Sequence, residues 1–183
     1  MSPYQVDLTD IAEELGGSIV LDDDVSLDDI HVGATVFVSV KPGHVSATLT
    51  NAGDSVMLYG TVTAAFDTEC VRCLETFTLH VEANLEGLYM AAENAAETSE
   101  DQEWEPLPAN GIIDLLPAID AALRLELPFA PLHAQDCAGI CPTCGVNVNE
   151  TECSCPDDEV EPGPFDALKS LFPEQGDELH TPD

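Results

Sequence analysis

Residues 56–89, VMLYGTVTAAFDTECVRCLETFTLHVEANLEGLY, carry two runs rich in Val, Thr, Phe and Tyr on either side of a Cys-x2-Cys motif. Such residues favour strands with one buried and one exposed face. Val56 to Phe66 and Phe77 to Tyr89 are therefore predicted to form two strands of one hairpin. Cys70 and Cys73 fall in the turn between the strands, so both thiols are expected at one end of the hairpin.

The strand pattern continues toward the N-terminus. Apolar residues alternate from His31 to Val40, pause at the turn residues Lys41-Pro42-Gly43, and resume from Val45 to Thr50. Two short apolar stretches precede this region, and they predict a helical turn at Ile11 to Leu15 and an edge strand at Ser18 to Leu21. Together these runs predict an antiparallel meander of about four strands, curved into a sheet or partial barrel.

A helical pattern follows the predicted sheet. Apolar residues recur at helical spacing from Ile112 to Leu127, and Pro117 is compatible with that helix only in its first turn. We expect the helix to cover the apolar face of the sheet. The extended stretch after Leu127 is then expected to carry His133 and Cys137 to the surface.

The spacing of the seven cysteines is typical of metal ligands. An odd count, in a chain whose first residues lack the features of a secretory signal, argues against a disulfide framework. With His133 the cysteines make eight sulfur or nitrogen ligands, the number needed for two closed tetrahedral zinc sites. The predicted ligands are Cys70, Cys73, His133, Cys137, Cys141, Cys144, Cys153 and Cys155, for one or two Zn²⁺ ions per chain.

Proximity in sequence favours one partition of these ligands. The four that lie within 15 residues would form one all-thiolate site: Cys141, Cys144, Cys153 and Cys155. The others would form a site that closes a loop of about 60 residues and ties the C-terminal segment to the sheet: Cys70, Cys73, His133 and Cys137. The single residue between Cys153 and Cys155 leaves open that one of them belongs to the other site or is free.

No catalytic motif accompanies the cysteines. The sequence contains no G-x-S-x-G, P-loop or H-E-x-x-H pattern, and a closed thiolate zinc site offers no activated water. A redox pair would explain one Cys-x2-Cys motif but not the other five cysteines. The sequence therefore predicts a protein that is not an enzyme, with a thiol redox or metal sensor as an alternative.

Charge restricts the possible partners. The chain has 36 acidic and 4 basic side chains, a formal net charge of −32. It cannot present the basic stripe by which most autonomous nucleic-acid-binding proteins hold phosphate, so DNA is not expected as a partner and direct RNA contact is in doubt. No apolar run reaches the length of a membrane span, and we expect a cytoplasmic protein. The acidity fits solubility, an acidic host proteome, or a surface for basic partners.

Three blocks of the sequence resemble the YceD family of large ribosomal RNA subunit accumulation proteins. They are CVRCL at 70–74, the stretch from IDLL at 113–116 to LPFAPLH at 127–133, and CAGICPTCGVNVN at 137–149. GPFDALKSL at 163–171 also resembles the closing helix of that family. The resemblance covers roughly residues 30–172, and its specificity lies in the order and separation of the blocks.

The resemblance implies a bacterial, cytoplasmic zinc-binding factor in ribosome biogenesis, needed for processing or accumulation of large-subunit (23S) ribosomal RNA. Implied partners are large-subunit precursors, ribosomal proteins or rRNA-processing enzymes. It also implies that the site of Cys70, Cys73, His133 and Cys137 is the one shared by the family, with the other site an added staple. A zinc-ribbon interaction module outside ribosome assembly is the alternative.

The sequence thus predicts an α+β fold, in which one or two helices pack on the meander and a cysteine-rich zinc-binding segment follows. The expected organisation is a β-rich domain at residues 1–90, an acidic linker at 91–110, a covering helix with an extended segment at 111–136, a zinc-binding segment at 137–156, and an acidic tail with a short helix at 157–183.

Overall fold

Two long strands form the centre of the computed structural model, which describes residues 4–91 and 104–155. β6 (Ser55–Glu69) and β7 (Thr76–Met90) pair antiparallel along their whole length, and the knuckle containing Cys70 and Cys73 joins them. β7 occupies one edge of β6. β5 (Gly43–Asn51) and β4 (Thr35–Ser39) share its other edge, one after the other.

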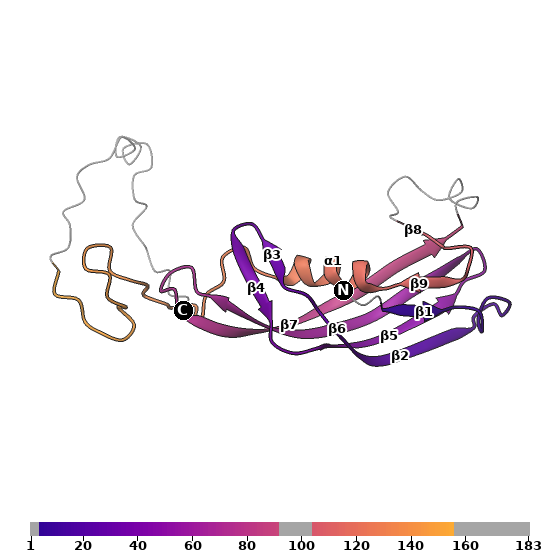
Figure 1. The fold of residues 1–183 in the computed structure, drawn as a ribbon, viewed down its shortest axis with the longest axis horizontal. Helices are drawn as coiled ribbons and strands as arrows, with labels where there is room; N and C mark the ends of the chain where they lie inside the picture. The colour runs from indigo at the N-terminus through magenta and orange to yellow at the C-terminus, as the bar shows by residue number, and fades with distance from the viewer. Residues whose placement is uncertain (1–3, 92–103, 156–183) are drawn as a thin grey trace, which may run out of the picture.

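The remaining strands complete two sheets. β2 (Ser18–Val25) pairs with β5, β3 (Ile30–Val32) pairs with β4, and the short β8 (Glu105–Pro106) pairs in parallel with β7. These strands form a seven-stranded, mostly antiparallel sheet. β1 (Gln5–Asp7) and β9 (Ile112–Asp114) form a separate two-stranded sheet. The predicted antiparallel β fold is confirmed: the residues that the structure describes form a long curved sheet with one helix (Figure 1).

One face of the large sheet carries the core. Alternate side chains of β5, β6 and β7 are buried in one core, which they share with α1 (Leu116–Glu126) and with residues of β1 and β9; α1 lies along this side (Figure 1). The side chains between them form the opposite, solvent-exposed face, which we call the open face. The fully buried core residues include Phe37, Val45, Leu49, Leu58, Val62, Phe66, Leu115, Ile119 and Leu123.

The predicted strand from His31 to Val40 is wrong in its continuity. The chain reverses at Gly33, whose φ of +61° suits a residue without Cβ, and forms the β3–β4 hairpin instead. In β4 the buried residue is Phe37 and not one of the alternating valines. Phe37 is buried and its ring meets Phe66 edge-on at 6.4 Å between centroids, whereas Val36 and Val38 are exposed on the open face.

The predicted helix starts too early in the sequence. Ile112–Asp114 forms β9, because it finds a pairing partner in β1, and α1 begins only at Leu116. Pro117 occupies the first turn of α1, as predicted, where its missing N–H leaves no unpaired group. The helix ends at Leu127, whose extended backbone starts the segment that leads to His133.

Near the N-terminus, β2 lies at the edge of the sheet, as predicted, and extends through the acidic run Asp22–Asp24. The stretch from Ile11 to Leu15, predicted as a helical turn, forms consecutive hydrogen-bonded turns. Most of the predicted linker and the whole predicted tail, residues 92–103 and 156–183, lie outside the described residues. Within residues 4–91 and 104–155, no helix is long and apolar enough to cross a membrane.

Candidate metal centre

The first cysteine cluster, which we call the knuckle cluster, joins the β6–β7 turn to the segment after α1. It consists of Cys70, Cys73, His133 and Cys137, whose ligand atoms all lie within 4.8 Å of one another. The Sγ atoms of Cys70 and Cys137 are 3.7 Å apart, and Cys73 Sγ lies 3.2 Å from His133 Nδ1. All three thiols are buried, so the expectation that Cys137 lies at the surface is wrong.

Backbone hydrogen bonds place the two halves of the knuckle cluster together. The Val71 N–H donates to the Pro131 carbonyl at 3.0 Å, and the Ile140 N–H donates to the Arg72 carbonyl at 3.1 Å. The C-terminal segment is thereby bound to the turn on both sides of its own ligands. Cys137 is buried because it packs against Cys70 and Cys73 in a small apolar cluster that is separate from the main core.

The second cluster, which we call the terminal cluster, consists of Cys141, Cys144, Cys153 and Cys155, again with all Sγ atoms within 4.8 Å of one another. Cys153 Sγ lies 3.3 Å from Cys141 Sγ and 3.5 Å from Cys144 Sγ. A hydrogen bond links the two closely spaced cysteines, because the Cys155 N–H donates to the Cys153 sulfur at 3.4 Å. Both cysteines of this closely spaced pair thus join one cluster.

Both clusters fit a tetrahedral zinc ion in ligand type and spacing. A zinc–sulfur bond of about 2.3 Å places two ligands of a tetrahedron roughly 3.8 Å apart. The sulfur–sulfur distances of 3.3 to 3.7 Å are close to this value and far longer than a disulfide, and all seven cysteines are free. Three thiolates with one imidazole, and four thiolates, are both common structural zinc sites.

Thiol ionisation in the clusters is uneven. Burial opposes ionisation of Cys70, yet hydrogen bonds led by the His133 side chain outweigh it and lower the Cys70 pKa to about 5. Burial raises the Cys73 pKa to about 11. In the terminal cluster, hydrogen bonding from the Cys144 backbone lowers the Cys141 pKa to about 6, and hydrogen bonding with Cys153 raises the Cys155 pKa to about 12. Neighbouring thiolates repel, so full ionisation of either cluster requires a cation.

The two Cys-x2-Cys turns have the same backbone geometry but different fifth residues. The Leu74 N–H donates to the Cys70 carbonyl at 2.9 Å, just as the Gly145 N–H donates to the Cys141 carbonyl at 2.9 Å. Both residues are left-handed, with φ of +61° at Leu74 and +74° at Gly145. Glycine adopts this conformation freely, whereas a residue with a Cβ incurs roughly 1–2 kcal/mol. The first turn therefore stores strain that the second avoids.

Asn149 links the knuckle cluster to the chain beyond it. Its side-chain N–H donates to Cys137 Sγ at 3.5 Å, and its side-chain oxygen, Oδ1, accepts the Ala138 N–H at 2.6 Å. A donor to a ligand sulfur stabilises the charged thiolate. The spacing of the cysteines does not predict a role for Asn149. The sequence singles it out only as the last residue of the block at 137–149 that resembles the family.

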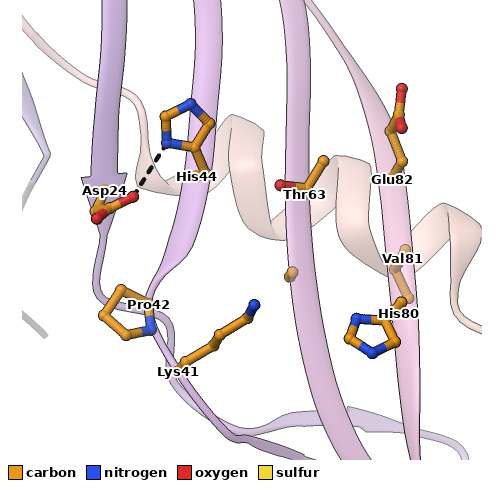
Figure 2. Close-up of a pocket in the computed structure, with 9 residues that line it drawn as sticks. Asp24, Lys41, Pro42, His44, Thr63, His80, Val81 and Glu82 are labelled. Atoms are coloured by element: carbon orange, nitrogen blue, oxygen red, sulfur yellow. Dashed lines mark hydrogen bonds and ion pairs between the residues drawn. The ribbon is translucent and has the colours of Figure 1, made fainter.

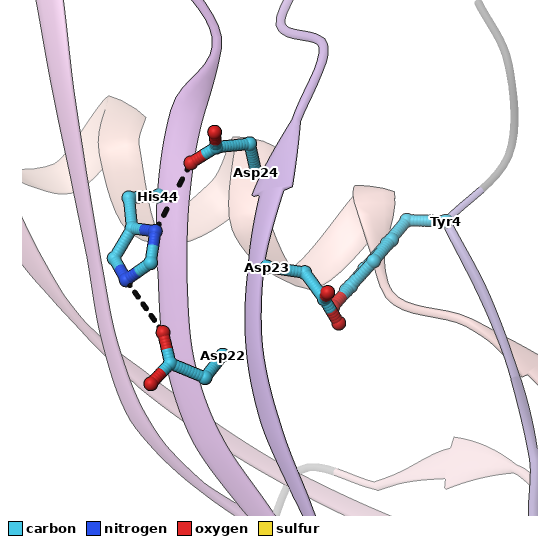
Figure 3. Close-up of polar contacts among 5 residues, drawn as sticks. All are labelled: Tyr4, Asp22, Asp23, Asp24 and His44. Atoms are coloured by element: carbon cyan, nitrogen blue, oxygen red, sulfur yellow. Dashed lines mark hydrogen bonds and ion pairs between the residues drawn. The ribbon is translucent and has the colours of Figure 1, made fainter.

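A polar site on the open face was missed by the sequence reasoning. His44 Nε2 lies 2.9 Å from an Asp22 carboxylate oxygen and His44 Nδ1 lies 3.0 Å from an Asp24 oxygen, so the imidazole bridges two residues of β2 (Figure 3). Asp23 points to the other side, where it accepts the Tyr4 hydroxyl at 3.3 Å. The hydrogen bond with Asp24 is the main cause of a raised His44 pKa.

His44 borders a groove of about 540 Å³ on the open face, with α1 behind the sheet (Figure 2). Strand register explains this grouping, because Asp24, His44, Thr63 and Glu82 stand opposite one another on four adjacent strands. In a sheet such residues share one face. The cysteine clusters are the only groups of four metal-binding side chains within the described residues.

Mycobacterial proteins match most of the length of this chain. An uncharacterized protein of Mycobacterium leprae is 32% identical over 163 residues, which cover 88% of this chain and 75% of the relative. An uncharacterized protein of Mycobacterium tuberculosis is 31% identical over 153 residues, 79% of this chain and 70% of the relative. No solved structure matches the chain significantly.

Residues 58–172 match the family described as large ribosomal RNA subunit accumulation protein YceD. The matched range spans nearly all of β6, together with β7, α1 and both cysteine clusters. The chain therefore belongs to the YceD family.

Proposed function

We propose that this protein is a non-enzymatic zinc-binding factor of ribosome biogenesis that supports processing or accumulation of 23S ribosomal RNA. The family match over residues 58–172 is the observation that carries this proposal, because it includes both cysteine clusters and the strands that position them. The description of the family supplies the link to large-subunit rRNA.

The cysteine clusters would serve as structural zinc sites. When bound, zinc supplies positive charge that lets neighbouring thiols ionise together. The residues themselves do the positioning: Cys70 and Cys73 come from the sheet, and His133 and Cys137 come from the segment after α1. Four protein ligands leave no open coordination position, which favours an architectural role over hydrolysis.

The net charge of the chain favours protein partners over RNA. A chain with a net charge of −32 is repelled by rRNA phosphates, whereas basic ribosomal proteins or an rRNA-processing enzyme would be attracted. The attraction should weaken as salt is added. A complex with large-subunit components that is insensitive to salt would contradict this part of the proposal.

Deletion of the gene in the native host tests the function. We expect a lower ratio of 23S to 16S rRNA in the deletion strain, restored by the wild-type gene and by L125A, a change at an exposed position of α1. The double variant C70S/C73S should fail to restore the ratio. A tagged protein should recover large-subunit precursors and early-binding ribosomal proteins at physiological salt.

Two other results would contradict the proposal. An unchanged rRNA ratio, with another machine recovered by the tagged protein, would favour a zinc-ribbon interaction module outside ribosome assembly. Zinc that leaves the folded protein on mild oxidation of the thiols would favour a redox or metal sensor, since structural zinc should leave only with unfolding.

A further inference from the structure

A groove of about 670 Å³ opens on the open face, between β4 and the knuckle at the end of β6. β4 pairs with β6 only at Val38 and Ser39 and then turns away to join β3. A single side-chain bond, from the Thr68 hydroxyl to the Val36 carbonyl at 3.0 Å, spans the divergence. The groove lies in the resulting wedge.

Four exposed apolar side chains gather around the groove. They are Val36, Val38, Val71 and Leu74, which are 40%, 46%, 48% and 60% exposed, and the rest of the lining includes three threonines and two acidic residues. Isolated exposed apolar residues are ordinary, but several around one concave surface indicate a binding site. Two of the four belong to the knuckle, since Val71 follows Cys70 and Leu74 follows Cys73.

Leu74 supplies an independent sign of function. Its turn is matched by the turn at Gly145, where glycine adopts the left-handed backbone without strain. Leu74 accepts the strain and yet leaves 60% of itself exposed, so little internal packing compensates for it. Strain of this kind, at a residue directed to solvent, points to a contact outside the chain.

Charge identifies the occupant. The charged residues that line the groove are Asp67 and Glu69, and both are acidic. The chain's own residues 157–183 contain nine acidic residues and one lysine, and a second copy carries the same charge of −32. Both of these occupants would be repelled, and so would RNA. A cationic segment with apolar side chains is complementary to the groove in both respects.

We propose that this groove docks a basic protein segment that inserts apolar side chains between β4 and the knuckle, with Leu74 as the main contact. The inference rests on the proposed function for the identity of the partner. If the protein acts in ribosome biogenesis, the basic segment belongs to a protein of the large ribosomal subunit. Its physical basis is the groove, the strained backbone of Leu74 and the two acidic residues in the lining.

Site-specific photocross-linking in the native host tests the proposal. A photoreactive phenylalanine analogue would replace Val71 in one variant and Tyr59 in another. Tyr59 is the matched control because it is exposed on the open face of β6 and does not line the groove. We expect the Val71 variant to cross-link an identifiable basic protein, through a segment rich in Lys or Arg and apolar residues, and the Tyr59 variant to give only background.

Substitution of Leu74 then separates recognition from folding. In the Val71 cross-linking background, L74G should reduce the yield by about tenfold while metal content stays constant and the melting temperature is unchanged or higher. L74N, which also tolerates the left-handed backbone, should behave like L74G, and L74M should keep most of the yield. Loss of yield together with loss of metal would instead show that Leu74 acts through the fold.

Several outcomes would overturn the proposal. Cross-links to residues 157–183 would show an internal occupant, cross-links to a second copy would show a dimer interface, and cross-links to RNA would show direct RNA contact. Yields at Val71 no higher than at Tyr59 would show that nothing docks there. If only the docking proposal is wrong, L74G will still restore the ratio of 23S to 16S rRNA in the deletion strain. If only the ribosomal function is wrong, deletion will leave that ratio unchanged, and a basic protein will still cross-link at Val71.

Discussion

At the scale of single residues, strand register decides which charged side chains meet on the open face. His44 is twenty residues or more from both of its carboxylate partners, yet the pairing of β2 with β5 places it between them. Because the imidazole gains favourable partners only in the folded state, its folded pKa is raised above the unfolded value of 6.5.

The bridge made by His44 should make stability depend on pH. A raised folded pKa means that the stabilisation is fully present below pH 6.5 and disappears as pH rises through the folded pKa. We therefore expect H44Q to lower the melting temperature at pH 5.5 and to have almost no effect at pH 9. Thermal unfolding at both values checks this, with H80Q on the same face as control. An H44Q effect that grows with pH would contradict it.

Cysteine spacing favoured the two sets of four side chains that the structure brings together, although it left open the placement of Cys153 and Cys155. That these sets bind metal stays a prediction. The same reasoning missed His44 and Asn149. Nothing near His44 in the sequence suggests its partners, because they belong to another strand, and the bond from Asn149 to Cys137 depends on the fold of the whole loop.

At the scale of elements, the local pattern of apolar residues predicted β6, β7 and the α1 region. It did not predict the elements whose structure depends on pairing with distant segments. Val36 and Val38 look like core residues by alternation, yet the β3–β4 hairpin turns them to solvent and buries Phe37. Ile112–Asp114 fits a helical pattern, yet β1 draws it into a strand. A reversal at one glycine and a partner from the far N-terminus are not visible in the periodicity of the segments themselves.

Helix α1 should stabilise the sheet through one face only. Ile119 is fully buried against the core, whereas Leu125 is 86% exposed. I119A should reduce the free energy of unfolding by about 2–5 kcal/mol because it leaves a cavity, and L125A should change it by about 0.5 kcal/mol or less. Chemical denaturation with zinc present measures both. Equal effects would show that α1 does not use the face assigned to it.

The terminal cluster should be separable from the sheet. C141S/C144S removes two of its four ligands, so we expect the loss of one metal ion per chain while the β-sheet signal in circular dichroism remains. C70S/C73S is the matched variant. It should also lose one ion, and it should lower the melting temperature more because the knuckle cluster joins segments about 60 residues apart. Unchanged metal content in C141S/C144S would overturn the partition.

At the scale of the whole molecule, like charge opposes compactness. The 36 acidic side chains face only 4 basic ones, and one of these, Arg124, is already paired with Asp120 at 2.6 Å. Self-repulsion on this scale destabilises a folded chain unless ions screen it. The protein is therefore expected to be most stable in a salty environment.

Salt should raise thermal stability. Screening shortens the Debye length from about 10 Å at 0.1 M to about 3 Å at 1 M, which weakens repulsion among surface carboxylates. We expect the melting temperature of the zinc-loaded protein to rise steadily with potassium chloride over this range. Chloride is preferred because sulfate also strengthens apolar burial. A melting temperature that falls with chloride would show that attractive pairs such as Arg124–Asp120 outweigh the repulsion.

The wide separation of the knuckle ligands also has a consequence for synthesis. Cys73 and His133 are 60 residues apart in the chain. At about 5–20 residues per second, the imidazole leaves the ribosome roughly 3–12 s after the thiol. During that interval the nascent hairpin exposes an incomplete set of thiols, so the knuckle cluster can close only after α1 has been translated.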